Sequence, residues 1–138
     1  MGAQEDANIK IIKTFYEYLA KGDRDWIYAN LIADDIELIE PPSLPYGGIY
    51  KGKDLVRRTL KTVVETWDNM EFKIVNYLAG GDSVVVHAYL GCTGRRTGKS
   101  FHIPMMELWR IRDGKIIELR PFFHDTAKMV EVYGKSAT

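Results

Sequence analysis

Glu40 is the residue of this sequence best placed to carry out acid–base chemistry. It ends the apolar run Ile36-Glu37-Leu38-Ile39 and directly precedes two prolines, which lack the N–H that a sheet requires and therefore end a strand. A carboxylate at such a strand end lies at the rim of the core, where partial burial raises its pKa towards neutrality. Glu40 is therefore a candidate general base, and the alternative is an ordinary solvated carboxylate.

A second candidate, Glu107, lies within the apolar run from residue 103 to residue 109. A carboxylate among isoleucine, methionine, leucine and tryptophan side chains is costly to bury unless it is paired. Glu107 is therefore either a functional acid or half of a structural ion pair. The partners available for such a pair are Arg110, Arg112 and Arg120.

Three helices are predicted in the first half of the chain, from apolar residues at helical spacing. Gly22 stops the first, Asp23 caps the second, and Lys53 or Asp54 opens the third. The elements predicted for this half are a helix at 9–19, a short helix after residue 23, a strand at 36–40, a loop at 41–50 and a helix from 53 or 54 to 67.

Beyond Asn69, β-branched and aromatic residues predict four strands, and Asp113-Gly114 is a strong hairpin signal between the last two. The predicted strands are Phe72–Ala79, Val84–Gly91, Lys99–Arg112 and Lys115–His124. Helices followed by an antiparallel meander indicate an α+β domain with the helices on one face of a curved sheet. The strand at 99–112 is apolar on both faces. We therefore expect a homodimer through the outer face, and the alternative is a distorted strand that buries both sides.

Composition narrows the protein class. With 138 residues and 46% hydrophobic content, we expect one domain spanning residues 1–138, with its core at about 9–134. Zero net charge argues against a nucleic-acid partner, and no apolar run is long enough to span a membrane. A single cysteine, Cys92, and an N-terminus without signal-peptide features favour a cytoplasmic protein.

Several segments resemble the nuclear transport factor 2-like superfamily, and within it the SnoaL-like polyketide cyclases and ketosteroid isomerases. The resemblance implies a cone in which a strongly bent antiparallel sheet wraps three N-terminal helices around an apolar pocket, a cystatin-like roll that is often dimeric. The segments that carry it are Leu19-Ala-Lys-Gly-Asp23, Ala33-Asp34-Asp35 with Glu40-Pro41, Tyr50-Lys-Gly-Lys-Asp54 and Trp109-Arg-Ile-Arg-Asp-Gly-Lys-Ile116.

The resemblance also implies roles for individual residues. Glu40-Pro41 stands where ketosteroid isomerases have the Asp-Pro of their proton-shuttling base, and Glu107 where they keep a protonated acid in the oxyanion hole. Their tyrosine aligns with Phe15, leaving Tyr16 out of register, which counts against a steroid isomerase. SnoaL-like cyclases use an acid near the end of the last strand, where this chain has His124 and then Asp125.

Side-chain alternation from Glu107 directs Met105 and Trp109 into the same pocket. The resemblance adds His87 to the inward face of the preceding strand, together with Val85 and Tyr89, and leaves Val84, Val86, Ala88 and Leu90 for the outer face. The alternative for His87 is a core histidine bonded to a backbone carbonyl. The residues expected to line the pocket are Tyr16, Trp26, Tyr50, Trp67, Tyr89, Met105, Trp109 and Phe123.

The expected function is a cofactor-independent enzyme that transfers protons on a hydrophobic carbonyl compound by isomerisation, cyclisation or dehydration. Glu40 would remove a proton, Glu107 would stabilise the enolate, and His87, His124 or Asp125 would assist. We expect no metal site, because the three histidines lack metal-ligand spacing. The alternatives are a ligand-binding or dimeric assembly module and, more weakly, an epoxide hydrolase, which needs an Asp-Arg-Asp set in the cavity.

Overall fold

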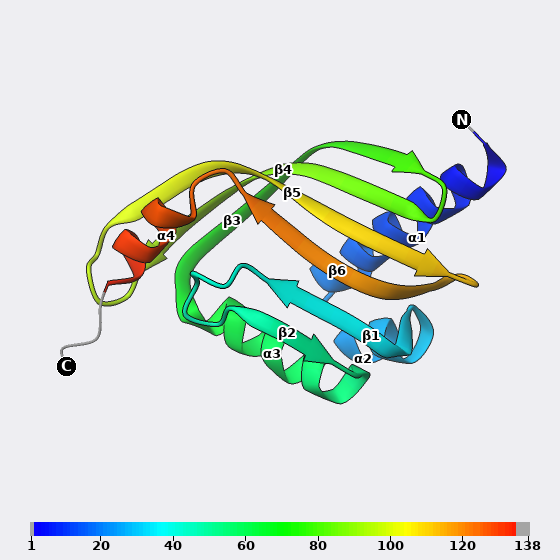
Figure 1. Cartoon of the computed structure of the whole chain (residues 1–138), viewed down its shortest axis with the longest axis horizontal. Helices are drawn as coiled ribbons and strands as arrows, with labels where there is room; N and C mark the ends of the chain where they lie inside the picture. The colour runs from blue at the N-terminus through cyan, green and yellow to red at the C-terminus, as the bar shows by residue number, and fades with distance from the viewer. Residues whose placement is uncertain (1, 135–138) are drawn as a thin grey trace.

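The computed structural model describes residues 2–134 and shows four helices and a curved six-stranded sheet within that range (Figure 1). The elements, in chain order, are α1 (Ala3–Ala20), α2 (Arg24–Asn30), β1 (Ile32–Glu40), β2 (Gly48–Lys51), α3 (Lys53–Thr66), β3 (Trp67–Gly80), β4 (Ser83–Gly94), β5 (Ser100–Arg112), β6 (Lys115–Phe123) and α4 (Thr126–Tyr133). None of these helices is long and apolar enough to cross a membrane.

The strand order is β2-β1-β6-β5-β4-β3, and only the β1–β6 pair is parallel. The expected α+β fold with a bent antiparallel sheet is confirmed, and its one departure is the parallel β1–β6 pair. β1 precedes the meander β3–β6 in the chain and joins its far edge, so it runs in the same direction as β6. This parallel pairing brings the end of β1, and with it Glu40, to the strands that carry Glu107.

Side-chain caps begin α2 and α4 among the described helices. The side chain of Asp23 accepts a hydrogen bond from the Trp26 backbone N–H, which confirms it as the cap of α2. The predicted hairpin between β5 and β6 turns at Asp113 and Gly114, both with positive φ. Two elements were not predicted: β2, within and just beyond the expected loop at 41–50, and α4, which Asp125 caps.

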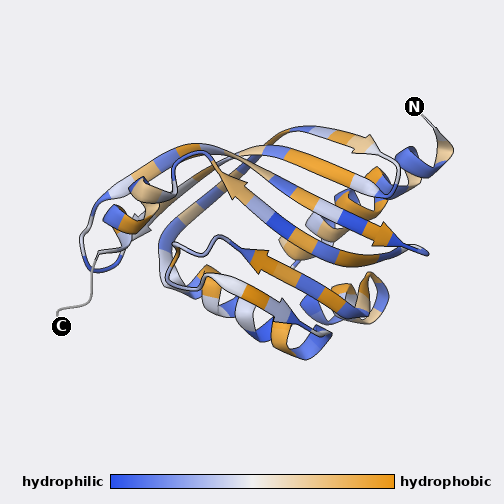
Figure 2. Ribbon diagram, viewed as in Figure 1, coloured by the Kyte–Doolittle hydropathy of each residue, from blue (hydrophilic) through white to orange (hydrophobic). Residues whose placement is uncertain are grey.

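The core lies between α1, α3 and the inner face of the sheet, which we define as the face that carries Trp109 and Leu119 (Figure 1). Figure 2 shows hydrophobic residues recurring along the strands of this sheet. Trp67, expected in the third helix, is instead the first residue of β3 and is buried. The buried positions of β5 alternate as expected from Phe101 to Trp109.

The face assignment predicted for β4 is reversed in the structure. Val84, Val86, Ala88 and Leu90 are buried on the inner face, where Val86 pairs with Glu107. Val85, His87 and Tyr89 therefore lie on the outer face, and His87 pairs there with Met106. Both faces of β4 are apolar, so alternation alone did not reveal which one the helices cover.

Candidate functional site

Glu107 lies on the inner face of β5 and is held through one carboxyl oxygen. Its Oε1 accepts a hydrogen bond from the Tyr16 hydroxyl of α1 and one from Trp109 Nε1, 3.3 Å away. Burial raises the pKa of Glu107 to about 7, and these two hydrogen bonds oppose the rise because they stabilise the ionised form. Glu107 is thus an oriented carboxyl group that titrates near neutral pH.

Tyr16 occupies the place that the sequence comparison gave to Phe15. Burial, followed by the charge of Glu107, raises the pKa of the Tyr16 hydroxyl, which therefore stays protonated and donates. Phe15 packs against the Trp109 ring, with centroids 4.9 Å apart. The expectation that Tyr16 is out of register is wrong, because the rotation of α1 on the sheet directs residue 16 towards Glu107.

Glu40 ends β1 with its side chain on the inner face. It is only 4% exposed, and its Oε1 is buried without a hydrogen-bond partner among the described residues. Burial, and then the negative charge of Glu107, raise its pKa to about 8. The alternative of a solvated carboxylate is therefore wrong: at neutral pH, Glu40 is a mostly protonated acid in the core.

The sheet register relates the two acids to each other. Leu38 of β1 pairs with Leu119 of β6, and Pro121 of β6 pairs with Glu107 of β5. Continuing the parallel register by two residues places Glu40 beside Pro121, so the two glutamates rise from strands that are two apart. Two strand spacings amount to about 10 Å between backbones. Side chains of glutamate length on one face can thus both reach a small molecule between them.

Neither glutamate is neutralised by an arginine within residues 2–134. Arg110 pairs with Asp82 and Glu118, and Arg112 pairs with Asp35, all away from the inner acids. The Nε of Arg120 is buried and has no partner among the described residues. The structural ion pair considered as the alternative for Glu107 is therefore absent from the described part of the chain, and Glu40 and Glu107 share one apolar interior.

Three residues predicted to be catalytic lie elsewhere. His87 is on the outer face, and His124 is an exposed residue whose backbone N–H donates to the Pro104 carbonyl. Asp125 is also exposed, and its side chain accepts from the Lys128 backbone N–H as the cap of α4. Within the described residues, none of the three makes a hydrogen bond or ion pair with Glu40 or Glu107.

The residues expected to line the pocket divide in the same way. Met105 and Trp109 lie on the inner face as predicted, Trp67 is buried, and Phe123 is half-buried. Tyr89 is exposed on the outer face. Trp26 stacks on Tyr18, with ring centroids 3.7 Å apart and nearly parallel planes.

Two tyrosines of the interior were not predicted. Tyr46 is buried, and its hydroxyl oxygen accepts from Trp67 Nε1 at 3.0 Å, while Tyr50 donates to the Tyr46 backbone carbonyl. Tyr77 lies on the inner face of β3, opposite Val86. Burial, and then the charge of Glu107, raise the pKa of Tyr77. A tyrosine after Pro45 in a loop carries no periodic signal, so only the fold reveals Tyr46.

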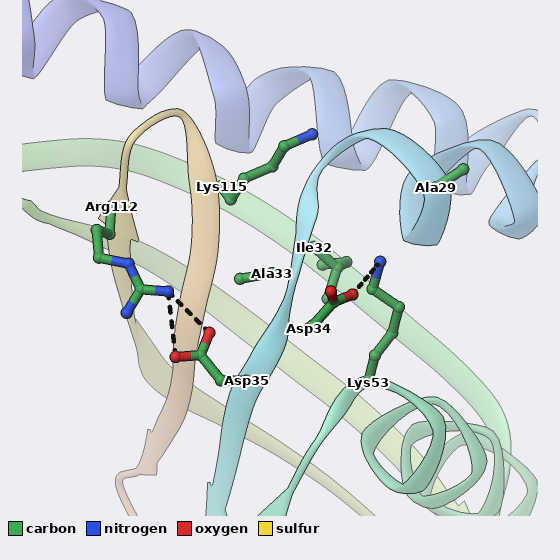
Figure 3. Close-up of a pocket in the computed structure, with 8 residues that line it drawn as sticks. All are labelled: Ala29, Ile32, Ala33, Asp34, Asp35, Lys53, Arg112 and Lys115. Carbon is green, nitrogen blue, oxygen red and sulfur yellow. Dashed lines mark hydrogen bonds and ion pairs between the residues drawn. The ribbon is translucent and has the colours of Figure 1, made fainter.

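Neither of two surface hollows is lined by Glu40 or Glu107. The larger, about 520 Å³, lies between α2, β1 and the β5–β6 hairpin. Figure 3 shows that its charges are paired across it, Asp34 with Lys53 and Asp35 with Arg112. These exposed ion pairs do not provide the interior Asp-Arg-Asp set of an epoxide hydrolase. Within residues 2–134, no three histidine, cysteine or acidic side chains are grouped as metal ligands.

The smaller hollow, about 200 Å³, opens on the outer face of the sheet. It is lined by His87, Pro104, Met105, Met106, Phe122, Phe123 and His124. The two histidines that were expected beside the catalytic acids thus meet here, on the opposite side of the sheet from Glu40.

Comparison with known proteins agrees with this architecture. A nuclear transport factor 2-like protein from Burkholderia thailandensis E264 is 29% identical over 93% of this chain and 98% of its own, with a TM-score of 0.82. TerC, co-crystallised with polyporic acid, is 25% identical over 92% of this chain and 98% of its own, with a TM-score of 0.78.

A protein from Jannaschia sp. CCS1, provisionally named a SnoaL-like polyketide cyclase, shares the fold at 18% identity. It covers 99% of this chain and 98% of its own, with a TM-score of 0.80. No curated protein gives a significant match. The SnoaL-like domain matches residues 12–119, which is most of the sequence. The chain therefore belongs to the SnoaL-like domain family.

Proposed function

We propose that this protein is a cofactor-independent enzyme that moves protons on a hydrophobic carbonyl compound. The observation that carries the proposal is the pair of acids on one inner face, Glu40 buried and Glu107 half-buried, neither of which is ion-paired within residues 2–134. Burial of two carboxyl groups without ion pairing is costly for a purely structural core. Such a cost is expected where acids of altered pKa carry out catalysis.

The pair supplies one acid and one base near neutral pH. With pKa values of about 7 and about 8, Glu107 and Glu40 together hold a single proton between those limits. In the free protein that proton resides on Glu40. Two hydrogen bonds stabilise the ionised form of Glu107, whereas Glu40 Oε1 accepts none from the described residues. This is the reverse of the roles expected from the sequence.

In the proposed mechanism, a bound ketone returns the proton to Glu107 and leaves Glu40 as the base, as expected from the sequence. A carbonyl oxygen beside Glu107 favours the neutral acid, because neutral Glu107 can donate through Oε2, the oxygen that Tyr16 and Trp109 leave free. Ionised Glu40 then removes a proton from the carbon next to the carbonyl, and the enolate oxygen is stabilised by Glu107. Isomerisation, aldol-type cyclisation and dehydration all begin with this step.

The decisive experiment replaces Glu40 with glutamine and measures both turnover and binding. Suitable first probes are cyclic ketones, enones and polyporic acid, chosen from the similarity to the SnoaL-like neighbours. Glu40→Gln should lower turnover by about 10²- to 10⁴-fold while ligand binding persists. Glu37→Gln is the matched control, because Glu37 lies on the same strand, half-buried, and is ion-paired with Lys51. Equal turnover in wild type and Glu40→Gln would mean that the protein only binds its ligand.

We also propose that the protein forms a homodimer through the outer face of the sheet. Exposed hydrophobic residues gather on that face across four strands, among them Met106 and Phe122, which are 46% and 53% exposed. The others on this face are Leu78 and Tyr89. A contiguous apolar surface of this kind is more typical of an interface than of a solvated sheet.

Sedimentation velocity tests this proposal directly. The wild type should sediment as a dimer, and Phe122→Asp should give a folded monomer with an unchanged circular dichroism spectrum. Leu55→Asp is a control at an exposed hydrophobic residue of α3, in the helix layer on the other side of the sheet from the proposed interface. A wild-type monomer at micromolar concentration would refute the dimer.

A further inference from the structure

Tyr46 is a buried hydrogen-bond donor whose own proton has no recorded acceptor among residues 2–134. The residue is 8% exposed, and its hydroxyl oxygen already accepts from Trp67 Nε1 at 3.0 Å. A tyrosine hydroxyl can accept and donate at the same time, so its donating capacity remains available. An unused buried donor is costly, so a ligand oxygen that accepted this proton would be held favourably.

The loop that carries Tyr46 folds back towards Glu40. Glu40 pairs with Gly48 across β1 and β2, and two turn hydrogen bonds, Leu44 N–H to Pro41 O and Gly47 N–H to Leu44 O, tighten the residues between them. Gly47 packs so closely on the preceding prolines that an added Cβ would lie 2.7 Å from the Pro42 carbonyl oxygen.

This close fold keeps Tyr46 and Glu40 in one region of the interior. Tyr46 is two residues before Gly48, the strand partner of Glu40, and both side chains are buried. In agreement with this placement, the pKa of the Tyr46 hydroxyl is raised, first by burial and then, against the opposing Trp67 hydrogen bond, by the charge of Glu40. Glu40 thus has a neutral hydroxyl donor near it.

The interior therefore contains two separate polar groups, each built from a tyrosine and a tryptophan. We call Tyr16, Glu107 and Trp109 the Glu107 group, and Tyr46 and Trp67 the second donor group. The Glu107 group is positioned by α1 and β5, and the second donor group by the β1–β2 loop and β3. A ketone bound at the Glu107 group alone would present no oxygen to the second donor group.

We propose that the ligand carries two oxygen functions on a hydrophobic skeleton. Its carbonyl oxygen lies at the Glu107 group, and a second carbonyl, hydroxyl or phenol oxygen accepts a hydrogen bond from Tyr46. This inference rests on the proposed function, because it assumes that Glu107 receives the reacting carbonyl. It narrows the substrate class from ketones in general to hydroxyketones and diketones, and it makes Tyr46 a specificity-determining residue.

Three compounds with one skeleton test the inference: 4-phenylbutan-2-one with one oxygen, and 4-hydroxy-4-phenylbutan-2-one and 4-(4-hydroxyphenyl)butan-2-one with two. The tryptophan indole N–H signals of ¹⁵N-labelled protein report on each group separately, because Trp109 and Trp67 donate to different groups. The one-oxygen ketone should shift Trp109 only. At least one two-oxygen compound should shift both signals, leave Trp26 unchanged and bind about 5- to 100-fold more tightly.

Tyr46→Phe should abolish that preference and leave the affinity for 4-phenylbutan-2-one unchanged. Tyr28→Phe is the matched control, since Tyr28 is also 8% exposed but lies in α2 and belongs to neither polar group. The wild-type comparison requires no variant, so a misfolded Tyr46→Phe protein would not prevent a decision. A two-oxygen compound that binds no more tightly than the ketone, an unmoved Trp67 signal, or no shift with any compound would overturn the inference.

The inference and the proposed function can fail separately. If Glu40→Gln loses turnover but Tyr46→Phe has no selective effect, the catalytic pair stands and the second donor group does not. If the two-oxygen preference is found but Glu40→Gln changes no turnover, the protein is a selective binder of such compounds.

Discussion

Replacement of Glu40 by glutamine should change how the stability of the protein depends on pH. Burial and the charge of Glu107 raise the pKa of Glu40 from an ordinary value of 4.5 to about 8. The folded state therefore retains a proton that the unfolded chain has already lost between those pH values. Stability should consequently fall as pH rises through this range, and the contribution of Glu40 is complete only below about pH 4.5.

The magnitude follows from the size of the pKa shift. A shift of about 3.5 pH units, at about 1.4 kcal/mol for each unit, corresponds to a loss of about 5 kcal/mol between pH 4.5 and pH 8. Glu107, whose pKa is raised from 4.5 to about 7, causes a further loss of stability as pH rises between those two values. A Glu40→Gln variant retains the Glu107 contribution, so the difference between the two proteins isolates Glu40.

Urea unfolding of wild type and Glu40→Gln at pH 5, 6, 7 and 8 is the suitable assay. The amide carries its own buried polar atoms, so the absolute stabilities at pH 5 matter less than the two slopes. As pH rises from 5 to 8, the free energy of unfolding of the variant should increase by several kcal/mol relative to that of the wild type. Parallel pH profiles for the two proteins would refute the claim that Glu40 is buried and protonated at neutral pH.

Three further predictions concern single contacts. Tyr16→Phe removes a hydrogen bond that stabilises ionised Glu107, so the pKa of Glu107 should rise above about 7 in an NMR titration of the carboxyl carbons. Gly47→Ala should destabilise the protein by about 1–3 kcal/mol in urea unfolding because the new methyl group meets backbone carbonyls, whereas Gly80→Ala, with open space around it, should cost less than about 1 kcal/mol. Asp125→Ala should cost about 1 kcal/mol in the same assay and leave turnover unchanged, because this side chain caps α4; a large loss of turnover would contradict that assignment.

Local patterns in the sequence were sufficient to predict most of the elements. Helical spacing located the first three helices, and Asp23 and Asp113-Gly114 marked a cap and a hairpin that the structure contains. α4 carried a usable signal, Asp125 before a short apolar segment that ends at Gly134, but it was not predicted. These features depend on neighbours in the chain, which is why they can be predicted from it.

The parts that failed depend on contacts between distant segments. β4 is apolar on both faces, so only the packed helices decide that Val86 is inside and His87 outside. Residues 15 and 16 differ by about 100° around a helix, and the seating of α1 determines which one meets Glu107. The parallel β1–β6 pairing and the buried loop around Tyr46 likewise have no signature in local spacing.

The parallel pairing of β1 with β6 also determines when the acids of this protein come together. The meander from β3 to β6 pairs strands that are neighbours in the chain, whereas Leu38 meets Leu119 across about 80 residues. Closing so long a loop is entropically unfavourable until the meander exists to receive β1. A partly folded chain would therefore keep Glu40 in water with an ordinary pKa. The raised pKa of Glu40 therefore depends on the docking of β1 on β6, which also brings the two acids onto one face of the sheet.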